Sequence, residues 1–190
     1  MDKYQSISGE VEGLFKDRGS KFYAYVRPVS HRDEAEELLN ELRKSHFKAR
    51  HHCLAYRIGL DEIEERASDD GEPSGSAGMP ILNQLRSAEL NNIAAVVVRY
   101  FGGTKLGVSG LIHAYKEATI AALEVAQVIQ KEVRVWYRLT FDYSIMTQAM
   151  NVMKSEFLEC KDKILEEKGA LILGNSTSNK EEGLKKIGKS

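Results

Sequence analysis

Apolar and polar residues alternate in two stretches near the start of the chain, residues 6–15 and 21–29, on either side of the polar run 16–20. A period of two is typical of strands that bury one face. Gly19 lies in the intervening run and can adopt the positive φ that a tight turn needs. The pattern predicts a β-hairpin.

The period then changes to that of a helix, which we expect to end near Ser45. Ser30 is the expected N-cap, and Asp33 falls in the first turn, where a carboxylate is favourable. The apolar positions that face the core at this spacing are Ala35, Leu38, Leu39 and Leu42.

Residues 51–58 are expected to be extended, and the face that carries Leu54, Tyr56 and Ile58 is the predicted core side. Residues 60–78 have no regular apolar period and are rich in Asp, Glu, Ser, Gly and Pro, so we predict a loop. A loop of this length inside a compact domain is usually functional or disordered.

A short helix is predicted over residues 79–90, with Ile81, Leu82 and Leu85 turned inward. The continuous apolar run 93–98 is typical of a strand covered on both faces, so it is the expected centre of the sheet. Ser109 is the expected N-cap of a helix over residues 110–125.

The rest of the chain predicts a smaller companion domain, which places domain 1 at residues 1–134 and domain 2 at residues 135–190. A long strand over 128–143 is expected to cross between them, with the joint at residues 136–138. The elements expected after it are a helix over 146–157, a hairpin of strands 160–166 and 170–174, and a weak helix over 180–187.

Composition excludes several classes of protein. The formal net charge of -1 argues against the general electrostatic attraction of a strongly basic nucleic-acid-binding protein, although it permits a local basic patch. The residues that would form such a patch, or else a solvated surface, are Arg43, Lys44, Lys48, Arg50 and Arg57.

No apolar segment approaches the roughly 20 residues of a membrane span, and the polar start lacks a signal-peptide core, so a cytoplasmic protein is expected. The two cysteines predict neither a disulfide framework nor a cysteine-rich zinc site.

Two glycine-rich runs, residues 68–78 and 99–107, flank the apolar strand and are expected to meet in space. The second run combines cations, glycine amides and a helix N-terminus, a combination that favours anions. Its candidate anion-binding residues are Arg99, Tyr100, Gly102, Gly103, Lys105 and Ser109, with tight turning and close packing of the backbone as the alternative role of the glycines.

The first run contributes an acidic loop whose candidate residues are Asp69, Asp70, Glu72 and Ser74. These carboxylates would repel phosphate unless they hold a cation or pair with Arg99 or Lys105, and both alternatives stay open. His51 and His52 are candidate supporting residues.

Other chemical hypotheses are weaker. His51 and Cys53 share one face of a strand, but two ligands do not hold a zinc ion, so we predict no metal site and no cofactor. Residues 102–106 do not meet the GxxxxGK[ST] pattern of a nucleotide-binding loop. Ser74 or Ser76 could serve as a nucleophile with a histidine base, yet such loops contain serine far more often than a nucleophile.

Four segments together resemble the IMPACT/YigZ family: His51-His52-Cys53-Leu54-Ala55-Tyr56, Ser68 through Gly75 (SDDGEPSG), Gly78-Met79-Pro80, and Val97 through Gly107 (VVRYFGGTKLG). The resemblance covers residues 10 to 125. It implies an α+β protein whose first domain is an α/β sandwich similar to a small-subunit ribosomal protein and to the fourth domain of elongation factor G. A small ferredoxin-like α+β domain is implied after it. Such a domain needs a final strand after residues 180–187, so we expect it to be trimmed or to borrow an edge.

The resemblance also implies a link to translation regulation, because eukaryotic relatives regulate translation. Our leading hypothesis is a non-enzymatic binding protein for RNA, the ribosome or a translation factor. In it, Arg99 and Lys105 contact phosphate, and Tyr100 or Phe101 is available for stacking. The alternatives are an enzyme acting on a small phosphorylated or anionic substrate and a scaffold that binds protein alone.

Overall fold

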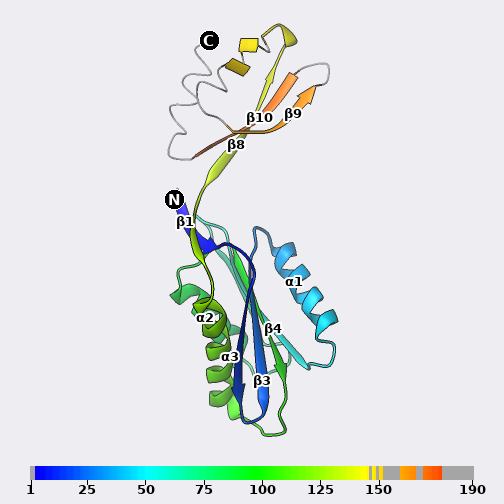
Figure 1. The fold of residues 1–190 in the computed structure, drawn as a ribbon, viewed down its shortest axis with the longest axis vertical. Helices are drawn as coiled ribbons and strands as arrows, with labels where there is room; N and C mark the ends of the chain where they lie inside the picture. The colour runs from blue at the N-terminus through cyan, green and yellow to red at the C-terminus, as the bar shows by residue number, and fades with distance from the viewer. Residues whose placement is uncertain (1–2, 146, 149, 152–158, 166–168, 177–190) are drawn as a thin grey trace. The chain divides into compact units, whose positions relative to one another are not determined.

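The computed structural model describes residues 3–145, 147–148, 150–151, 159–165 and 169–176 (Figure 1). The chain divides into two compact units, and we describe each by itself: the first is Tyr4–Lys131, and the main part of the second begins at Glu132. The boundary between residues 134 and 135 stays a prediction. The observed helices and strands confirm the α+β class, whereas the ribosomal-protein-like and ferredoxin-like assignments stay predictions.

The first unit is built on a five-stranded antiparallel sheet in the order β2-β3-β6-β4-β5. Its strands are β2 (Val11–Asp17), β3 (Ser20–Pro28), β6 (Ile93–Tyr100), β4 (His51–Ile58) and β5 (Glu64–Ser68). The apolar strand β6 lies at the centre, as predicted, because it alone is almost continuously hydrophobic and is buried along nearly its whole length.

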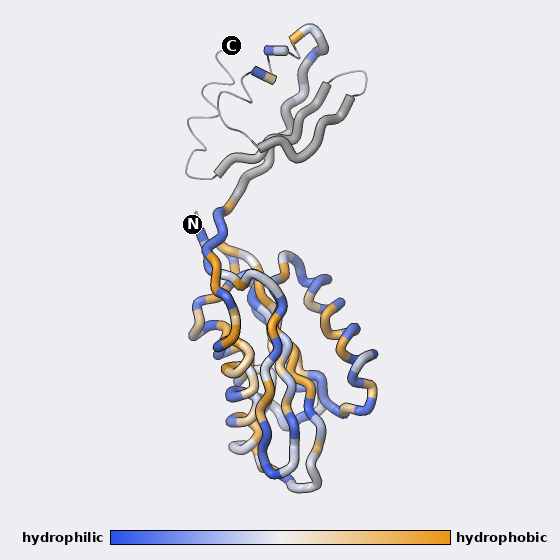
Figure 2. The backbone as a smooth tube through the Cα atoms, viewed as in Figure 1, coloured by the Kyte–Doolittle hydropathy of each residue, from blue (hydrophilic) through white to orange (hydrophobic). Residues whose placement is uncertain are grey.

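Helices cover both faces of this sheet (Figure 1). Helix α1 (Arg32–Ser45) packs on one face, and α2 (Gly78–Ser87) and α3 (Gly107–Glu124) pack on the other. Along β6, Val96 and Val98 point toward α1, whereas Ala95 and Val97 point toward α2 and α3. Figure 2 shows the mixture of polar and apolar residues along α1 that lets one side pack and the other meet solvent.

The sequence interpretation of residues 60–78 was wrong in part, because β5 lies within the predicted loop. This strand pairs only with β4 at the edge of the sheet, and its side chains are largely exposed. An edge strand needs no apolar run, so the charged sequence of β5 carries no hydrophobic pattern that would predict a strand. The one-sided core predicted for β4 was also wrong. Cys53 and Ala55 are buried on the α2 and α3 side while Leu54 and Tyr56 are buried on the other.

Both predicted serine caps were wrong. His31 precedes α1 in the N-cap position, and the Ser30 N–H donates instead to the Glu34 carboxylate at 2.5 Å. Helix α3 begins at Gly107, so Ser109 falls inside its first turn and Leu106 stands at the N-cap without a side-chain hydrogen bond. Gly107 has a φ of +74°, a conformation that lets the chain turn sharply into the helix.

Two further strands lie almost entirely within the first unit. The predicted first strand is interrupted: β1 (Lys3–Ile7) precedes β2 and pairs with β7 (Val128–Glu132) in a separate two-stranded sheet. The long strand predicted over 128–143 is likewise two strands, β7 and β8 (Arg134–Phe141), and the predicted joint at residues 136–138 lies inside β8.

The second unit contains a three-stranded antiparallel sheet in the order β8-β10-β9. A short 3-10 helix (Tyr143–Ile145) follows β8. The predicted hairpin is confirmed as β9 (Glu159–Leu165) and β10 (Gly169–Ser176). The predicted helix over 180–187, and most of the one over 146–157, lie outside the described residues. None of the helices in the described part of the chain is long and apolar enough to cross a membrane.

Candidate functional site

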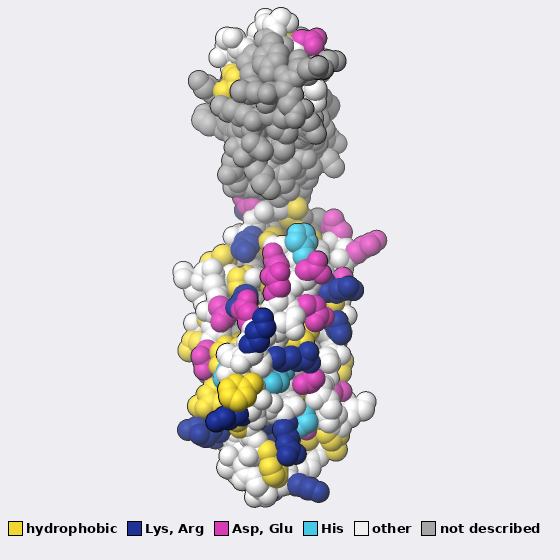
Figure 3. Space-filling view, turned by 90° about the vertical axis from the view of Figure 1, so that its right-hand side faces the viewer, with side chains coloured by type: hydrophobic (Ala, Val, Ile, Leu, Met, Phe, Trp, Pro, Cys, Tyr) yellow, Lys and Arg dark blue, Asp and Glu magenta, His cyan; other side chains and the backbone are white. Residues whose placement is uncertain are grey.

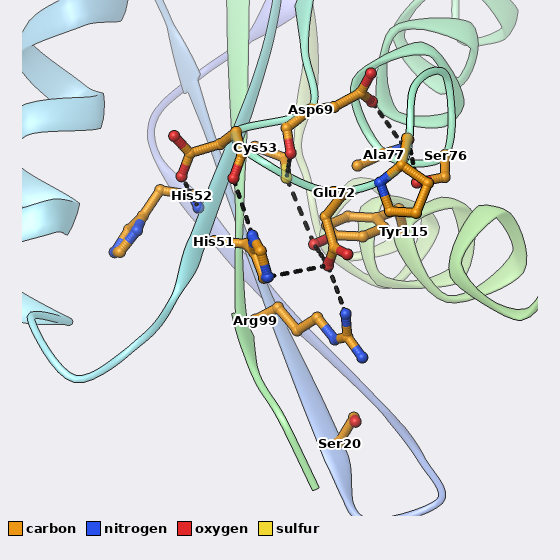
Figure 4. A network of polar contacts seen from close by, with 12 residues as sticks. Ser20, His51, His52, Cys53, Asp69, Glu72, Ser76, Ala77, Arg99 and Tyr115 are labelled. Atoms are coloured by element: carbon orange, nitrogen blue, oxygen red, sulfur yellow. Dashed lines mark hydrogen bonds and ion pairs between the residues drawn. The ribbon is translucent and has the colours of Figure 1, made fainter. Parts of the chain in front are cut away.

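The two glycine-rich runs meet beside the end of β6, on the face of the sheet that α3 covers. The meeting point is an ion pair in which the Arg99 guanidinium donates to Glu72 Oε1 at 2.6 Å. Glu72 lies in the loop between β5 and α2, and Arg99 lies near the end of β6. Figure 4 shows this pair within a wider network of polar contacts. The contact holds the two loops in register.

Asp69 shapes the acidic loop from inside. One of its carboxylate oxygens accepts from the N–H groups of Ala77 and Gly78 at 3.0 and 2.8 Å, and the other accepts from the Gly75 N–H at 2.8 Å. Burial opposes ionisation, but these three donors outweigh it and hold the pKa of Asp69 below its ordinary value. Ala77 and Gly78 begin α2, so Asp69 caps that helix from outside it.

Asp70 ties the loop to α1 and β4. Its φ of +42° lies in the left-handed region, which aspartate tolerates better than most residues. Its carboxylate accepts from the His52 backbone N–H at 2.7 Å and from the Arg43 guanidinium at 2.9 Å. Its carbonyl oxygen lies 2.9 Å from His51 Nδ1. All of these partners are internal, so Asp70 serves to position the loop.

Glu72 is the buried centre of the network, with a side chain only 4% exposed. Besides Arg99, Tyr115 Oη donates to its Oε1 at 2.8 Å. Burial, together with neighbouring Cys53 and Glu72, raises the pKa of Tyr115, so the phenol stays protonated and remains a donor. Cys53 Sγ completes the cluster, 3.4 Å from Tyr115 Oη and 3.1 Å from the Asp69 carbonyl oxygen. The Glu72 charge is thus compensated from within the protein.

The two histidines have different positions. Because the Asp70 carbonyl can only accept, His51 Nδ1 carries a proton, and its Nε2 lies 3.9 Å from Glu72 Oε1 (Figure 4). The His52 ring lies away from this cluster (Figure 4), and its burial lowers the pKa of the imidazole. His52 therefore supports the loop through its backbone N–H, whereas His51 places its ring beside Glu72.

A pocket of about 420 Å³ lies between the loops. Glu72 and Pro73 line it from the acidic loop, and Gly107 and Val108 line it from the start of α3. The remaining residues that line it are Arg50, His51, Arg99, Phe101, Lys105, Leu106 and Leu111. Arg50 and Lys105 are exposed and form no ion pair within the described part of the chain. The pocket therefore combines two uncompensated cations with the N–H groups of a helix N-terminus.

The Arg99 guanidinium is held mostly by contacts within the protein. Its guanidinium carbon lies 5.5 Å from the centre of the Phe22 ring and 5.6 Å from that of Phe101, so it also makes cation–π contacts. Its Nε is buried and has no hydrogen-bond partner among the described residues. Arg99 lines the pocket, but its positive charge is already paired with the Glu72 carboxylate.

The glycines differ in role. A Cβ on Gly102 would lie 1.9 Å from the Gly19 carbonyl carbon, so this glycine permits close packing against the β2–β3 turn. Its N–H donates to Ser20 Oγ at 3.1 Å. Gly103 has a φ of +92° and open space around the Cβ position, so it serves the turn. Packing and turning account for both residues.

The other candidates lie outside the pocket lining. Tyr100 Oη bonds to His46 Nδ1 at 2.9 Å, and its ring packs with the core under α1. Ser74 and Ser109 are exposed. Ser76 is buried and its hydroxyl donates to the Pro73 carbonyl at 2.6 Å, which leaves no free hydroxyl for nucleophilic attack. Within the described ranges, no group of three or more His, Cys, Asp or Glu side chains is placed to hold a metal ion.

Sequence reasoning did not identify three residues of this network as members of one site. Arg50 and Arg43 appeared only as members of a general basic run, and Tyr115 was not among the candidate site residues. The signal for Tyr115 was available, since a buried tyrosine usually finds a hydrogen-bond partner. The signal for Arg43 and Arg50 was absent, because only the fold brings the end of α1 and the start of β4 to the acidic loop.

Comparison with known proteins gives a consistent result over the region that builds the pocket. Residues 18–123 match the model of the Impact N-terminal domain. The IMPACT family member YvyE of Bacillus subtilis is 39% identical over 140 residues, which are 73% of this chain and 64% of YvyE. An IMPACT family member of Haemophilus influenzae is 34% identical over 159 residues, which are 83% of this chain and 77% of that protein.

The fold has a close counterpart among solved structures. A crystal structure of a hypothetical protein matches with a TM-score of 0.81 and 28% identity, over 98% of this chain and 92% of that one. The pocket residues from Arg50 to Leu111 all fall inside the matched domain. Domain match, sequence identity and coverage agree, and they show that this chain belongs to the IMPACT family.

Proposed function

We propose that this protein is a cytoplasmic, non-enzymatic RNA-binding protein that takes part in translation regulation, and that it holds a phosphate of RNA in the pocket between the two loops. The RNA can be free or part of a ribosome. The link to translation follows the family resemblance, and the choice of ligand follows the chemistry of the pocket.

One observation carries the proposal: Arg50, Lys105 and the N-terminus of α3 line the same pocket. Neither cation has an ion-pair partner in the described part of the protein. The first amides of α3 have no partner within their own helix, and the helix dipole favours an anion there. Phosphate is the group that such donors and cations suit best.

The acidic loop does not oppose this proposal. Glu72 lines the pocket, but Arg99 and Tyr115 compensate it, so its field on a bound anion is reduced. Asp69 and Asp70 accept from internal donors. The same contacts weaken the enzyme alternative, because these carboxylates are already occupied by hydrogen bonds and ion pairs that hold the loop.

Phe101 supports RNA over a simple inorganic anion. Its side chain lines the pocket and is 52% exposed, which is a large apolar ring to leave in water. Aromatic rings next to cations are a common means of binding unpaired bases, because every base has a π face. A nucleotide whose phosphate lies near Lys105 would place its base within reach of this ring.

The Lys105→Ala variant tests the proposal. We expect the affinity for a labelled single-stranded RNA decamer to fall about 3- to 10-fold at low salt, because one phosphate contact is lost. The slope of log affinity against log salt should become less steep by about 0.7, the value for one contact to a single strand. Fluorescence anisotropy over a salt series measures both quantities.

Lys116→Ala is the matched control, since Lys116 is an exposed lysine on α3 that does not line the pocket. It should leave affinity and slope nearly unchanged. Equal effects of the two variants would indicate general charge attraction and contradict a phosphate site at Lys105. Failure of the wild-type protein to bind RNA even at low salt would also overturn the proposal.

A further inference from the structure

A second pocket, of about 580 Å³, opens on the α1 side of the sheet, where α1 leaves the ends of β3 and β6 uncovered. We call it the tyrosine groove. The residues that line it are Glu12, Gly19, Lys21, Tyr23, Tyr25, His46, Tyr100 and Phe101. Four of these eight are tyrosine or phenylalanine, a far higher share of aromatic rings than the 8% in the whole chain.

The rings are held in place by contacts with one another. Tyr25 Oη lies 2.8 Å from His46 Nε2, and Tyr100 Oη lies 2.9 Å from His46 Nδ1. Tyr23 packs edge-on against Tyr100 with 5.9 Å between ring centres, and it lies the same distance from the His46 ring. Three partly buried tyrosines therefore form a preorganised aromatic surface.

Uncompensated positive charge borders this surface. The register of β2 and β3 places Lys16 directly opposite Lys21, and Lys21 lies opposite Tyr100 on β6. Like charges on directly opposed residues destabilise a sheet. Both lysines are exposed, and neither has an ion-pair partner within the described residues. Their position suits an anion that lies beside the aromatic rings.

The opposite end of the groove differs in charge. Glu12 lies opposite Tyr25, and burial together with this carboxylate raises the pKa of Tyr25 to about 12. A phosphate would be repelled there and attracted at the lysine end. Figure 3 shows how charged and hydrophobic side chains are distributed over one face of the protein. Acidic side chains lie mostly over the upper part of the described surface, and Lys, Arg and hydrophobic side chains predominate at its lower end.

Phe101 connects the two pockets, because it lines both the tyrosine groove and the pocket between the loops. It follows directly after β6, whose residues Arg99 and Tyr100 point to opposite faces of the sheet. One extended ligand can therefore contact both pockets by passing over the Phe101 ring at the sheet end.

We propose that the tyrosine groove is a base-stacking subsite for single-stranded RNA, continuous through Phe101 with the phosphate site near Lys105. This inference rests on the proposed function. The phosphates lie along the lysine end, and the bases stack on Tyr23 and Tyr100. A duplex does not fit this mode, because its bases are already stacked and paired. A proline-rich peptide would use the tyrosines but not the lysines.

Tyr23→Leu tests the subsite, since leucine keeps apolar contact with the core while it removes the ring. We expect the affinity for a labelled single-stranded uridine decamer to fall about 5- to 150-fold, the range for loss of one stacked base. Binding of uridine monophosphate, which is held by the phosphate site, should change less than 2-fold. Tyr4→Leu, a partly buried tyrosine on β1 outside both pockets, is the control.

Lys21→Ala provides a second variant at an exposed position, which keeps the test decisive if Tyr23→Leu fails to fold. It should weaken decamer binding and reduce the salt slope. If the decamer depends on Lys105 but is unaffected by both groove variants, the subsite is wrong and the proposed function stands. If wild type binds a matched duplex as tightly as the decamer, the stacking mode is wrong. If wild type binds no RNA, the proposed function is wrong as well.

Discussion

Glu72→Gln is expected to destabilise the protein by about 3 kcal/mol or more, because it leaves the buried Arg99 cation without a compensating charge. The two side chains are 4% and 8% exposed, so solvent screens little of the lost interaction. Glutamine keeps an oxygen that can accept from Tyr115 and Arg99, so the substitution removes charge while preserving shape. For a chain of this length, thermal unfolding should shift down by about 6 to 12 °C.

The same variant should bind anions more strongly. With Glu72 neutral, the Arg99 charge adds to those of Arg50 and Lys105 at the pocket. Inorganic phosphate should therefore raise the midpoint of thermal unfolding more in Glu72→Gln than in wild type. Glu36→Gln is the control, because Glu36 pairs with Arg66 at the surface and its loss should cost no more than about 1 kcal/mol. Equal stability losses in the two variants would contradict the role of the buried pair.

Asp69→Ala is expected to cost about 2 to 4 kcal/mol, because three backbone N–H groups lose a charged acceptor at once. The loop between β5 and α2 should loosen, and with it the placement of Glu72. Asp33→Ala is the matched control: Asp33 lies exposed in the first turn of α1, where only a favourable dipole interaction of about 0.3 to 1 kcal/mol is lost. Denaturant unfolding measures both losses.

The pH dependence of Asp69 has a defined sign. Its pKa is lowered in the folded protein, so its contribution is fully present above the ordinary aspartate pKa and is lost as pH falls through the lowered value. Wild type should therefore lose stability on acidification more than Asp69→Ala does. Parallel stability curves for the two proteins at acid pH would contradict the three-donor cap.

Much of the first unit follows from sequence periodicity. The central strand β6 and helices α1, α2 and α3 were predicted because burial imposes a continuous apolar run or a helical spacing on their sequences. Strand β5 was missed, since an edge strand with exposed side chains carries no such pattern. The predicted serine caps were wrong because helix boundaries depend on local backbone geometry, and the sequence offered several acceptable starts.

The candidate site was predictable in position but only partly in its contacts. Residue types and glycine content located the two loops, and their resemblance to a family made that location specific. The acidic loop could either bind a cation or form an internal ion pair. The choice depended on whether the Arg99 or the Lys105 side chain reaches Glu72. Only the fold decides that Arg99 pairs with it, while Lys105 has no ion-pair partner among the described residues. The sequence likewise left Gly102 open between ligand binding and close packing, and the approach of the β2–β3 turn accounts for it.

The central claim is that a phosphate of RNA is bound at the N-terminus of α3 between the two loops. The most direct test is to follow backbone amide resonances by NMR during titration with the single-stranded RNA decamer. We predict saturable shifts at Gly107 and Val108, which line the pocket, with smaller changes at Lys116 farther along α3. Saturable shifts confined to other surfaces, with Gly107 and Val108 unchanged, would contradict the account.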